Sequence, residues 1–286
     1  ALARTERKSG RGYKGFTIYA SPEVTLEEDL KRRDLTINAM AKSEDGTLID
    51  PFGGKKDLDA GVLRHVSEAF AEDPVRILRV ARFAARFGFS VHPSTLKLMQ
   101  KMVQAGEADF LVPERVWQEF SRGLAERRPE LMFEVLQRAG LLAKAFPEIK
   151  AWPRQFSGSL PVRFAVLAWP LGEEEVQALS ERLRAPSEVR DVALAAVRSK
   201  EGLKQSTPDA LLGVLKRADA FRRPERFAQL LEAARLADRG IDTARVERAR
   251  AAAAAVDASA IAPSAHGADI GRLIDEARLR VIRELG

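Results

Sequence analysis

The sequence predicts an α+β fold in which a small region of strands and turns precedes a long all-helical array. Short apolar runs bounded by glycine occur within the first 60 residues. From residue 72 onward, apolar residues recur at the three- and four-residue spacing of amphipathic helices. The 286 residues, 45% of them hydrophobic, are enough for more than one compact unit.

In the first region, residues 16–19 and 47–50 are expected to form strands, and residues 51–54 a tight turn. Residues 9–15 carry three glycines and predict a loop. The periodic part predicts helices over residues 73–87, 94–105, 113–126, 129–138, 161–169, 173–184, 187–199, 208–219, 224–238, 243–256 and 268–284. Glycines at 88, 140, 202 and 240 are expected to end helices.

Composition excludes several classes of protein. The chain has no cysteine, which rules out disulfides, thiolate zinc sites and a cysteine nucleophile. Its three histidines lie far apart and show no metal-ligand spacing. Neither a signal peptide nor a long apolar run is present, so we expect a cytoplasmic protein without a membrane partner. The net charge of +6 fits either a solvated surface or an RNA partner.

Two segments carry the candidate chemistry. In the first, Arg33 and Asp34 suit a phosphate and a ribose hydroxyl, and Asn38 shares their face if the segment is helical. The second is the helix predicted from residue 73, where spacings of three and four place a row of charges on one face. These charged residues are Glu72, Asp73, Arg76, Arg79, Arg82 and Arg86.

A carboxylate beside a guanidinium can read a nucleobase. The carboxylate accepts from an amino group, and the guanidinium donates to a ring nitrogen or carbonyl. Cytosine and adenine both present an amino donor beside a ring acceptor, so Asp73 with Arg76 would select C and A. Arg79 and Arg82 would then hold the triphosphate. An ordinary solvated helix face gives the same pattern, and these residues alone leave both interpretations open.

Several segments in order carry a family resemblance: residues 28–40, 49–54 with Asp57-Leu58, and 71–83. Together they resemble bacterial CCA-adding enzymes, the class II tRNA nucleotidyltransferases. Further similarity lies at residues 1–10, 63–66, 113–119 and 146–149, and it becomes faint beyond residue 150.

The resemblance implies template-independent addition of CCA to the 3′ end of tRNA from CTP and ATP, with Mg²⁺ as cofactor. It also implies a head, neck, body and tail. The expected domains are the C-terminal part of a nucleotidyltransferase head (residues 1–70), a base-recognising neck (71–125), a body with a degenerate HD-like region (126–200) and a tRNA-binding tail (201–286).

The resemblance also implies roles for single residues. Arg33, Arg79 and Arg82 match nucleotide-contacting arginines, and Asp34 matches the residue for ribose recognition. Asp73 and Arg76 match the base-reading pair, with Glu72 in support. Residues 9–15 match a flexible loop near the active site.

Two departures from the family pattern stand out. The family's Asp-x-Asp metal pair lies upstream of the first residue here, so no catalytic or metal-binding residue is expected within this sequence. We expect an N-terminally truncated, inactive piece, and Asp57-Leu-Asp59 falls at a different family position. Trp169-Pro170 stands where some relatives carry His-Asp, so no phosphohydrolase activity is expected.

Alternatives stay open at this point. Bacterial poly(A) polymerases share these motifs, and a non-catalytic RNA-binding relative would also fit. A CC-only or A-only enzyme is a further alternative. Either a monomer or a homodimer is expected.

Overall fold

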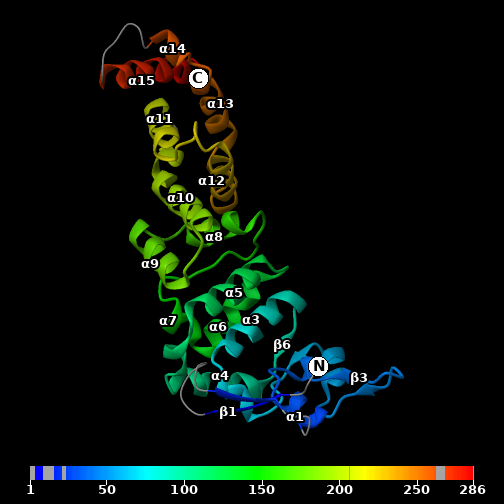
Figure 1. Cartoon of the computed structure of the whole chain (residues 1–286). Coiled ribbons are helices and arrows are strands. Elements are labelled where there is room, and N and C mark those ends of the chain that lie inside the picture. The colour runs from blue at the N-terminus through cyan, green and yellow to red at the C-terminus, as the bar shows by residue number, and fades with distance from the viewer. Residues whose placement is uncertain (1–3, 9–15, 21–23, 206, 262–267, 286) are drawn as a thin grey trace. The chain divides into compact units, whose positions relative to one another are not determined.

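The computed structural model describes residues 4–8, 16–20, 24–205, 207–261 and 268–285 (Figure 1). The chain forms two compact units. The first comprises Ala1–Phe156 with Glu181–Arg184, and the second comprises Ser157–Ser180 with Ala185–Gly286. All strands among the described residues belong to the first unit, and helices make up the second. The predicted α+β fold is therefore confirmed. The predicted loop at residues 9–15 lies outside the described residues.

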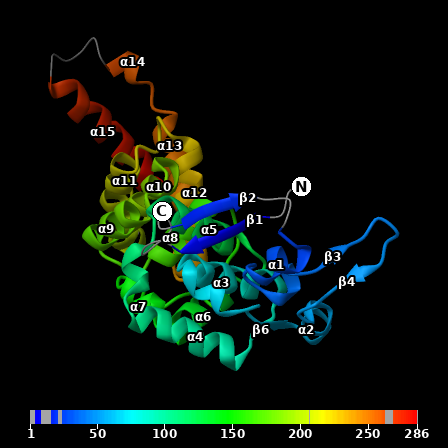
Figure 2. The same cartoon turned by 60° about the horizontal axis from the view of Figure 1, so that its bottom comes forward.

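The strands form three short two-stranded pairs. Strand β1 (Arg4–Lys8) is antiparallel to β2 (Phe16–Ala20), and the two run side by side in Figure 2. Strand β3 (Ala41–Lys42) is antiparallel to β4 (Leu48–Ile49). Strand β5 (Val62–Leu63) pairs in parallel with β6 (Ser90–Val91). The strands predicted at 16–19 and 47–50 are confirmed as β2 and β4.

The helices of the first unit largely match the predicted ones. They are α1 (Leu26–Lys31), α2 (Gly54–Ala60), α3 (Val75–Phe87), α4 (Pro93–Gln104), α5 (Pro113–Ala125), α6 (Pro129–Ala139) and α7 (Leu141–Ala145), with 3-10 turns η1 (Thr36–Asn38), η2 (Glu68–Glu72) and η3 (Glu107–Phe110). Helices α1, α2 and α7 were not predicted, because one or two turns are too short for apolar periodicity to show. Helix α1 is defined by a local cap instead: Thr25 and Glu28 form a capping box at its start.

The core of the first unit surrounds helix α3. This helix packs against α5 and α6, and the apolar residues that face them, including Ile77 and Val80, are fully buried. Three buried phenylalanines add to this core. The Phe120 ring centroid lies 6.0 Å from that of Phe133 and 5.3 Å from that of Phe146. Burying an aromatic ring contributes roughly 1.5–3 kcal/mol. This packing holds helix α3 in place, and its charged side chains, such as Arg76 and Arg79, extend from the opposite side of the helix.

Helix α2 fixes the segment around η1. The Asp50 carboxylate accepts hydrogen bonds from the amides of Gly54 (2.7 Å) and Lys55 (2.9 Å) and so begins the helix. A Cβ atom on Gly54 would lie 2.1 Å from the Thr36 carbonyl oxygen, so only glycine permits this approach. The Thr36 hydroxyl donates to the buried Asp57 carboxylate at 2.7 Å.

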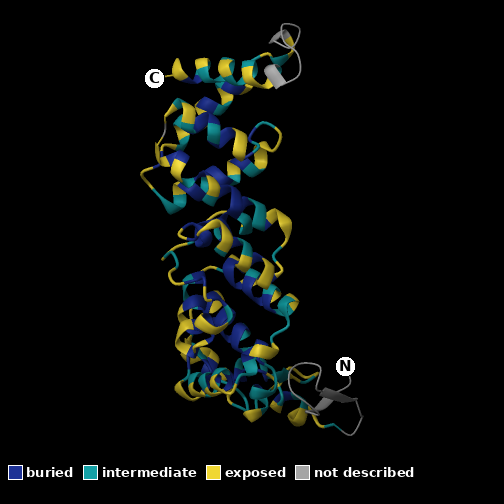
Figure 3. Ribbon diagram, turned by 90° about the vertical axis from the view of Figure 1, so that its left-hand side faces the viewer, coloured by how far each residue is buried: buried dark blue, intermediate teal, exposed yellow. Residues whose placement is uncertain are grey.

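The second unit consists of packed helices: α8 (Leu160–Ala168), α9 (Glu173–Leu183, whose last residues belong to the first unit), α10 (Ser187–Gln205), α11 (Pro208–Arg217), α12 (Pro224–Ala237), α13 (Thr243–Ala254), α14 (Ala258–Ile261) and α15 (Ala268–Arg283). Helix α10 packs against α8, α11 and α12, and α15 packs against α11 and α13. Figure 3 shows buried residues along one side of these helices and exposed residues along the other.

One predicted helix end in this unit was wrong. Gly202 was expected to end the helix that begins at residue 187, but α10 continues to Gln205. The glycine serves packing instead. A Cβ on Gly202 would lie 2.7 Å from a methyl carbon of Val214, so α11 approaches α10 closely at this point. Of the described helices, none has the length and apolar character needed to span a bilayer.

Candidate functional site

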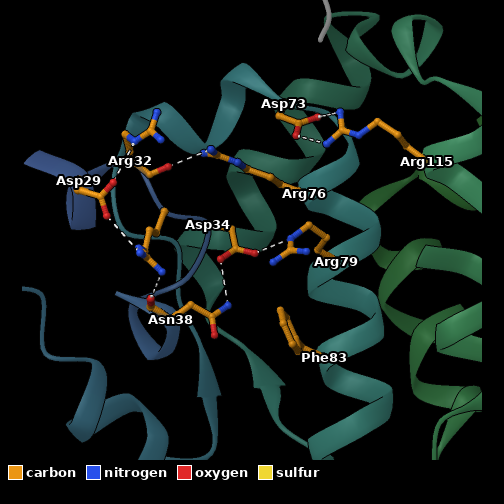
Figure 4. A pocket seen from close by; sticks show the side chains of 10 residues that line it. Asp29, Arg32, Asp34, Asn38, Asp73, Arg76, Arg79, Phe83 and Arg115 are labelled. Atoms are coloured by element: carbon orange, nitrogen blue, oxygen red, sulfur yellow. Dashed lines mark hydrogen bonds and ion pairs between the residues drawn. The ribbon is translucent and has the colours of Figure 1, made fainter. Parts of the chain in front are cut away.

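A pocket of about 510 Å³ lies between helix α3 and the segment that runs from α1 to η1. Figure 4 shows charged side chains from both sides of this pocket pointing into it. The lining residues are Asp29, Arg32, Arg33, Asp34, Asn38, Asp73, Arg76, Arg79, Phe83 and Arg115. The two segments singled out by sequence are therefore brought together at one site.

Asp73 stands at the entrance to α3. The residue is extended (φ −129°, ψ 107°), and Pro74 follows it at the N-cap, so the helix begins one residue later. The Asp73 carboxylate accepts from the Val75 amide at 3.1 Å. It also accepts two hydrogen bonds from the Arg115 guanidinium, at 3.0 and 2.7 Å. This bidentate contact fixes the plane of the carboxylate.

Arg76 lies one turn along α3 and is held by backbone carbonyls. Its guanidinium donates to the carbonyl of Ala69 at 2.7 Å and to that of Arg32 at 2.9 Å. Arg76 therefore ties the turn η2 and the end of α1 to helix α3. Its planar guanidinium is held in a fixed direction at the pocket wall.

Asp34 is the centre of a buried polar network. Its side chain is only 7% exposed. Its carboxylate accepts hydrogen bonds from the backbone amide of Leu35 (2.9 Å), the side-chain amide of Asn38 (3.0 Å) and Nε of Arg79 (2.7 Å). Burial by itself raises the pKa of Asp34, but the charge of Arg79 and these hydrogen bonds together bring it below the ordinary aspartate value.

Arg79 joins this network to helix α5. Besides Asp34, it donates to Oε1 of Glu119 at 3.3 Å. Burial lowers the pKa of Arg79, but the two carboxylates outweigh burial and raise it. Arg33, on the opposite wall, is half exposed, and pairs with Asp29 at 3.1 Å. Arg33 thus leaves part of its guanidinium open to the pocket.

Two of the predicted site residues do not line the pocket. Glu72 ends the turn η2, partly buried, and has no hydrogen-bonding partner among the described residues. Arg82 is 6% exposed, with Nε 2.5 Å from Glu119 and Nη1 3.7 Å from Glu126. Arg82 was expected beside Arg76 and Arg79 at the nucleotide, and its side chain does not line the pocket. Steps of three residues turn each side chain back by about 60° around a helix. Arg82 and Arg79 both contact the Glu119 carboxylate, and Arg82 is buried there without reaching the pocket.

Sequence reasoning missed four lining residues: Asp29, Arg32, Phe83 and Arg115. Arg115 lies in the segment 113–119 that resembles the family, but no role followed from that segment by itself. Asp29 and Arg32 lie in the segment 28–40. Asp29 pairs with Arg33 at the four-residue spacing of a helix, a common surface pattern. The Arg115–Asp73 pair leaves no local pattern, because the two residues are 42 positions apart.

The carboxylates Asp57 and Asp59 do not form a pair. Asp57 is buried, and Arg64 donates to it at 2.9 Å, whereas Asp59 is exposed and pairs with Lys55. Within the described ranges, no group of three or more His, Asp or Glu side chains is placed to hold a metal ion. Trp169 and Pro170 follow α8 and supply no metal ligand.

Family models match two parts of the chain. A model described as "Poly A polymerase head domain" matches residues 3–64, and one described as "Probable RNA and SrmB- binding site of polymerase A" matches residues 88–152. The first contains Arg33, Asp34 and Asn38, and the second contains Arg115. Helix α3 lies between the two matches.

Relatives match the chain over nearly its whole length. The "Multifunctional CCA protein" of Aromatoleum aromaticum is 48% identical over 341 residues, which cover 99% of this chain and 84% of that protein. The "CCA-adding enzyme" of Bordetella pertussis is 50% identical over 298 residues, covering 99% of this chain and 80% of that enzyme.

Solved structures share the fold. The "CCA-adding enzyme apo form II" has a TM-score of 0.72 at 23% identity, covering 99% of this chain and 72% of that one. The Bacillus stearothermophilus CCA-adding enzyme in complex with CTP has a TM-score of 0.69 at 25% identity, with coverages of 95% and 72%. The whole-length identity to the two curated relatives is decisive: this chain belongs to the family of CCA-adding enzymes, the tRNA nucleotidyltransferases.

Proposed function

We propose that the protein adds CCA to the 3′ end of tRNA, without a nucleic-acid template, from CTP and ATP. The observation that carries this proposal is the meeting of Asp73 and Arg76 in one pocket with the Arg33–Asp34–Asn38 segment. That pocket offers an acceptor beside a donor for a base, and further polar groups for a sugar and phosphates. The names of the relatives support the same reaction.

Base selection would rest on Asp73 and Arg76. The carboxylate accepts from the amino group of C or A, and the guanidinium donates to the neighbouring ring nitrogen. Uracil and guanine present the opposite order and would leave polar groups unpaired, at a cost of roughly 1–3 kcal/mol for each. Both side chains already make bonds within the protein, so the base would share or replace these partners.

The sugar and phosphates of the nucleotide would be held in the part of the pocket lined by Arg33, Asp34 and Arg79. Arg79 and the half-exposed Arg33 supply positive charge. Asp34 already receives three hydrogen bonds, which makes it the organiser of Asn38 and Arg79. A ribose hydroxyl would share an oxygen of this carboxylate. Arg82 would act through Glu119 and helix packing instead of by touching the triphosphate.

Mg²⁺ is the metal we propose for the transfer, since it is the usual partner of nucleoside triphosphates. In the described part of the chain no carboxylate cluster is placed to hold it. The work that these residues can do is to select the nucleotide and to orient it, and orientation alone can contribute several kcal/mol to a transfer reaction.

We assign the domains as head (residues 1–70), neck (71–125), body (126–200) and tail (201–286), with tRNA bound along body and tail. The reaction would take place in the cytoplasm, where tRNA is processed, in a monomer or a homodimer. We propose no phosphohydrolase activity, since Trp169 and Pro170 cannot replace metal-binding His and Asp.

Product length tests the proposal. Protein from the complete open reading frame is incubated with a tRNA lacking CCA, Mg²⁺, CTP and ATP, and the product is resolved to single nucleotides. Three added nucleotides followed by a stop are expected. A long A ladder would identify a poly(A) polymerase, the alternative favoured by the name of the matched head model. Addition of only C or only A would identify a specialist, and no extension would leave an RNA-binding relative.

A further inference from the structure

An aromatic ladder, which we define as Phe83, Phe87 and Phe89, leads from the nucleotide pocket to the surface. Phe83 lines the pocket and is 8% exposed. Its ring stacks on that of Phe87, with centroids 5.7 Å apart and planes 11° apart. The Phe87 ring meets Phe89 at 5.3 Å. Phe87 is 44% exposed, so the ladder presents an aromatic surface to solvent.

Local sequence builds this ladder. Phe83 and Phe87 are four residues apart on α3 and therefore lie one above the other. Gly88 ends the helix in the left-handed conformation (φ +72°), and its amide donates to the Ala84 carbonyl at 2.8 Å. This turn brings Phe89 back against Phe87. The exposed ring is thus held in place from two sides.

Arginines flank the ladder along its length. The guanidinium carbons of Arg79 and Arg82 lie 5.6 and 4.5 Å from the Phe83 ring centroid, and that of Arg86 lies 5.3 Å from the Phe87 centroid. Arg79 and Arg82 are neutralised by carboxylates. Arg86 is exposed, and no carboxylate among the described residues pairs with it. Its charge is therefore available to a phosphate.

We propose that Phe87 and Phe89, with Arg86, form a contact site for the unpaired 3′ nucleotides of the RNA primer. Exposed aromatic rings beside an arginine are the usual elements of single-strand RNA binding, since every base has a face that can stack. Continuity with the nucleotide pocket through Phe83 favours the 3′ end over other parts of the RNA. The inference rests on the proposed function, which makes an RNA 3′ end the substrate.

A two-by-two binding experiment tests this site. Wild type and Phe87→Ala, each from the complete open reading frame, are titrated with two acceptor-stem hairpins, one flush and one ending in unpaired cytidines. Base–aromatic contacts are worth roughly a 5- to 150-fold change in affinity per base. Phe87→Ala should weaken binding of the hairpin with unpaired ends by at least about 5-fold, and leave the flush hairpin within about 2-fold.

Matched variants separate ring contact from folding. Phe87→Leu keeps apolar bulk and should behave like the alanine variant, whereas Phe87→Trp should retain binding. Phe110→Ala removes a phenylalanine of similar exposure (39%) outside the ladder and should leave both affinities unchanged. Arg86→Gln should lower the salt dependence of binding by about one phosphate contact. Equal effects of Phe87→Ala on both hairpins, or retained affinity in Phe87→Leu, would overturn the inference.

A crosslink locates the bound base without catalysis. A hairpin with 5-iodocytidine at its 3′ end should, on irradiation, attach to the peptide containing residues 86–89, and this attachment should be lost in Phe87→Leu. If wild type adds CCA while attachment occurs elsewhere, this inference fails and the proposed function stands. A wild type that binds and crosslinks here yet adds no nucleotide keeps the site and overturns the proposed function.

Discussion

Arg115 of helix α5 donates two hydrogen bonds, of 3.0 and 2.7 Å, to the carboxylate of Asp73, which lies just before the N-terminus of helix α3. The two side chains are 27% and 15% exposed, so the pair is partly shielded from water. One carboxylate oxygen also accepts from the Val75 amide, which links the direction of the carboxylate to the helix axis. Arg115 thus orients the carboxylate that we propose reads the base, without being part of helix α3.

Arg115→Ala should weaken nucleotide use because Asp73 loses its fixed orientation. Hydrogen bonds between charged groups are worth roughly 1.5–3 kcal/mol, so kcat/KM for CTP and ATP should fall by about ten-fold or more. Arg115→Lys keeps the charge but cannot make both contacts, and should lose nearly as much. Arg122→Ala, an exposed arginine on the same helix, provides the control. Unchanged kinetics in Arg115→Ala would show that Asp73 is oriented by other groups.

Glu119→Gln should destabilise the first unit. Glu119 is 5% exposed and neutralises Arg82, which is itself 6% exposed, at 2.5 Å. Removing one member of a buried ion pair costs roughly 3–5 kcal/mol when the other charge loses its compensation, and only the more distant Glu126, at 3.7 Å, remains beside Arg82. Urea unfolding followed by tryptophan fluorescence measures the loss, since Trp117 lies on the same helix.

An exposed pair on α5 supplies the comparison for this measurement. Glu114 pairs with Arg184, and their side chains are 57% and 65% exposed. Glu114→Gln should cost roughly 0–1 kcal/mol. Equal losses in the two variants would mean that burial does not determine the strength of the Glu119 contact.

The helices were predictable from sequence because apolar spacing records which side of each helix is buried. Helix α3 was expected at 73–87 and lies at 75–87. The short helix α2 was missed, since its start depends on Asp50 accepting two amide hydrogen bonds and its position depends on contact with Thr36. Such local caps and long-range contacts leave no periodic pattern.

The pocket was predictable in part. Asp73, Arg76, Arg79 and the Arg33–Asn38 segment were expected at one site and do line it. Arg82 was expected there but is buried against Glu119 without lining the pocket, because the charge spacing along α3 does not reveal a carboxylate on another helix. Phe83 was not singled out, since an apolar residue on a helix gives no sign in the sequence that it lines a cavity.

Asp34 should make stability depend on pH at the acidic end. Its pKa in the folded protein lies below the ordinary aspartate value of 3.8. The stabilisation that the ionised Asp34 adds to the free energy of unfolding is therefore complete above 3.8. It is lost as the pH falls from 3.8 through the lower pKa of the folded protein, because the unfolded chain takes up the proton first. In urea unfolding, the advantage of wild type over Asp34→Asn should be constant near neutral pH and shrink below about pH 4. A difference that does not change with pH would contradict this role.

Asp73→Ala tests the base-reading pair most directly. Without the carboxylate, nothing in the pair accepts from the amino group of C or A, while Arg76 can still donate to any base. We expect most activity to be lost and the remaining incorporation to include U and G, measured by extension of a tRNA lacking CCA with single nucleotides. Glu68→Ala removes an exposed carboxylate on the preceding turn and should keep both rate and selectivity. If Asp73→Ala retained its preference for C and A, discrimination would have to come from Arg76 and the backbone around the pocket, and the carboxylate would be structural only.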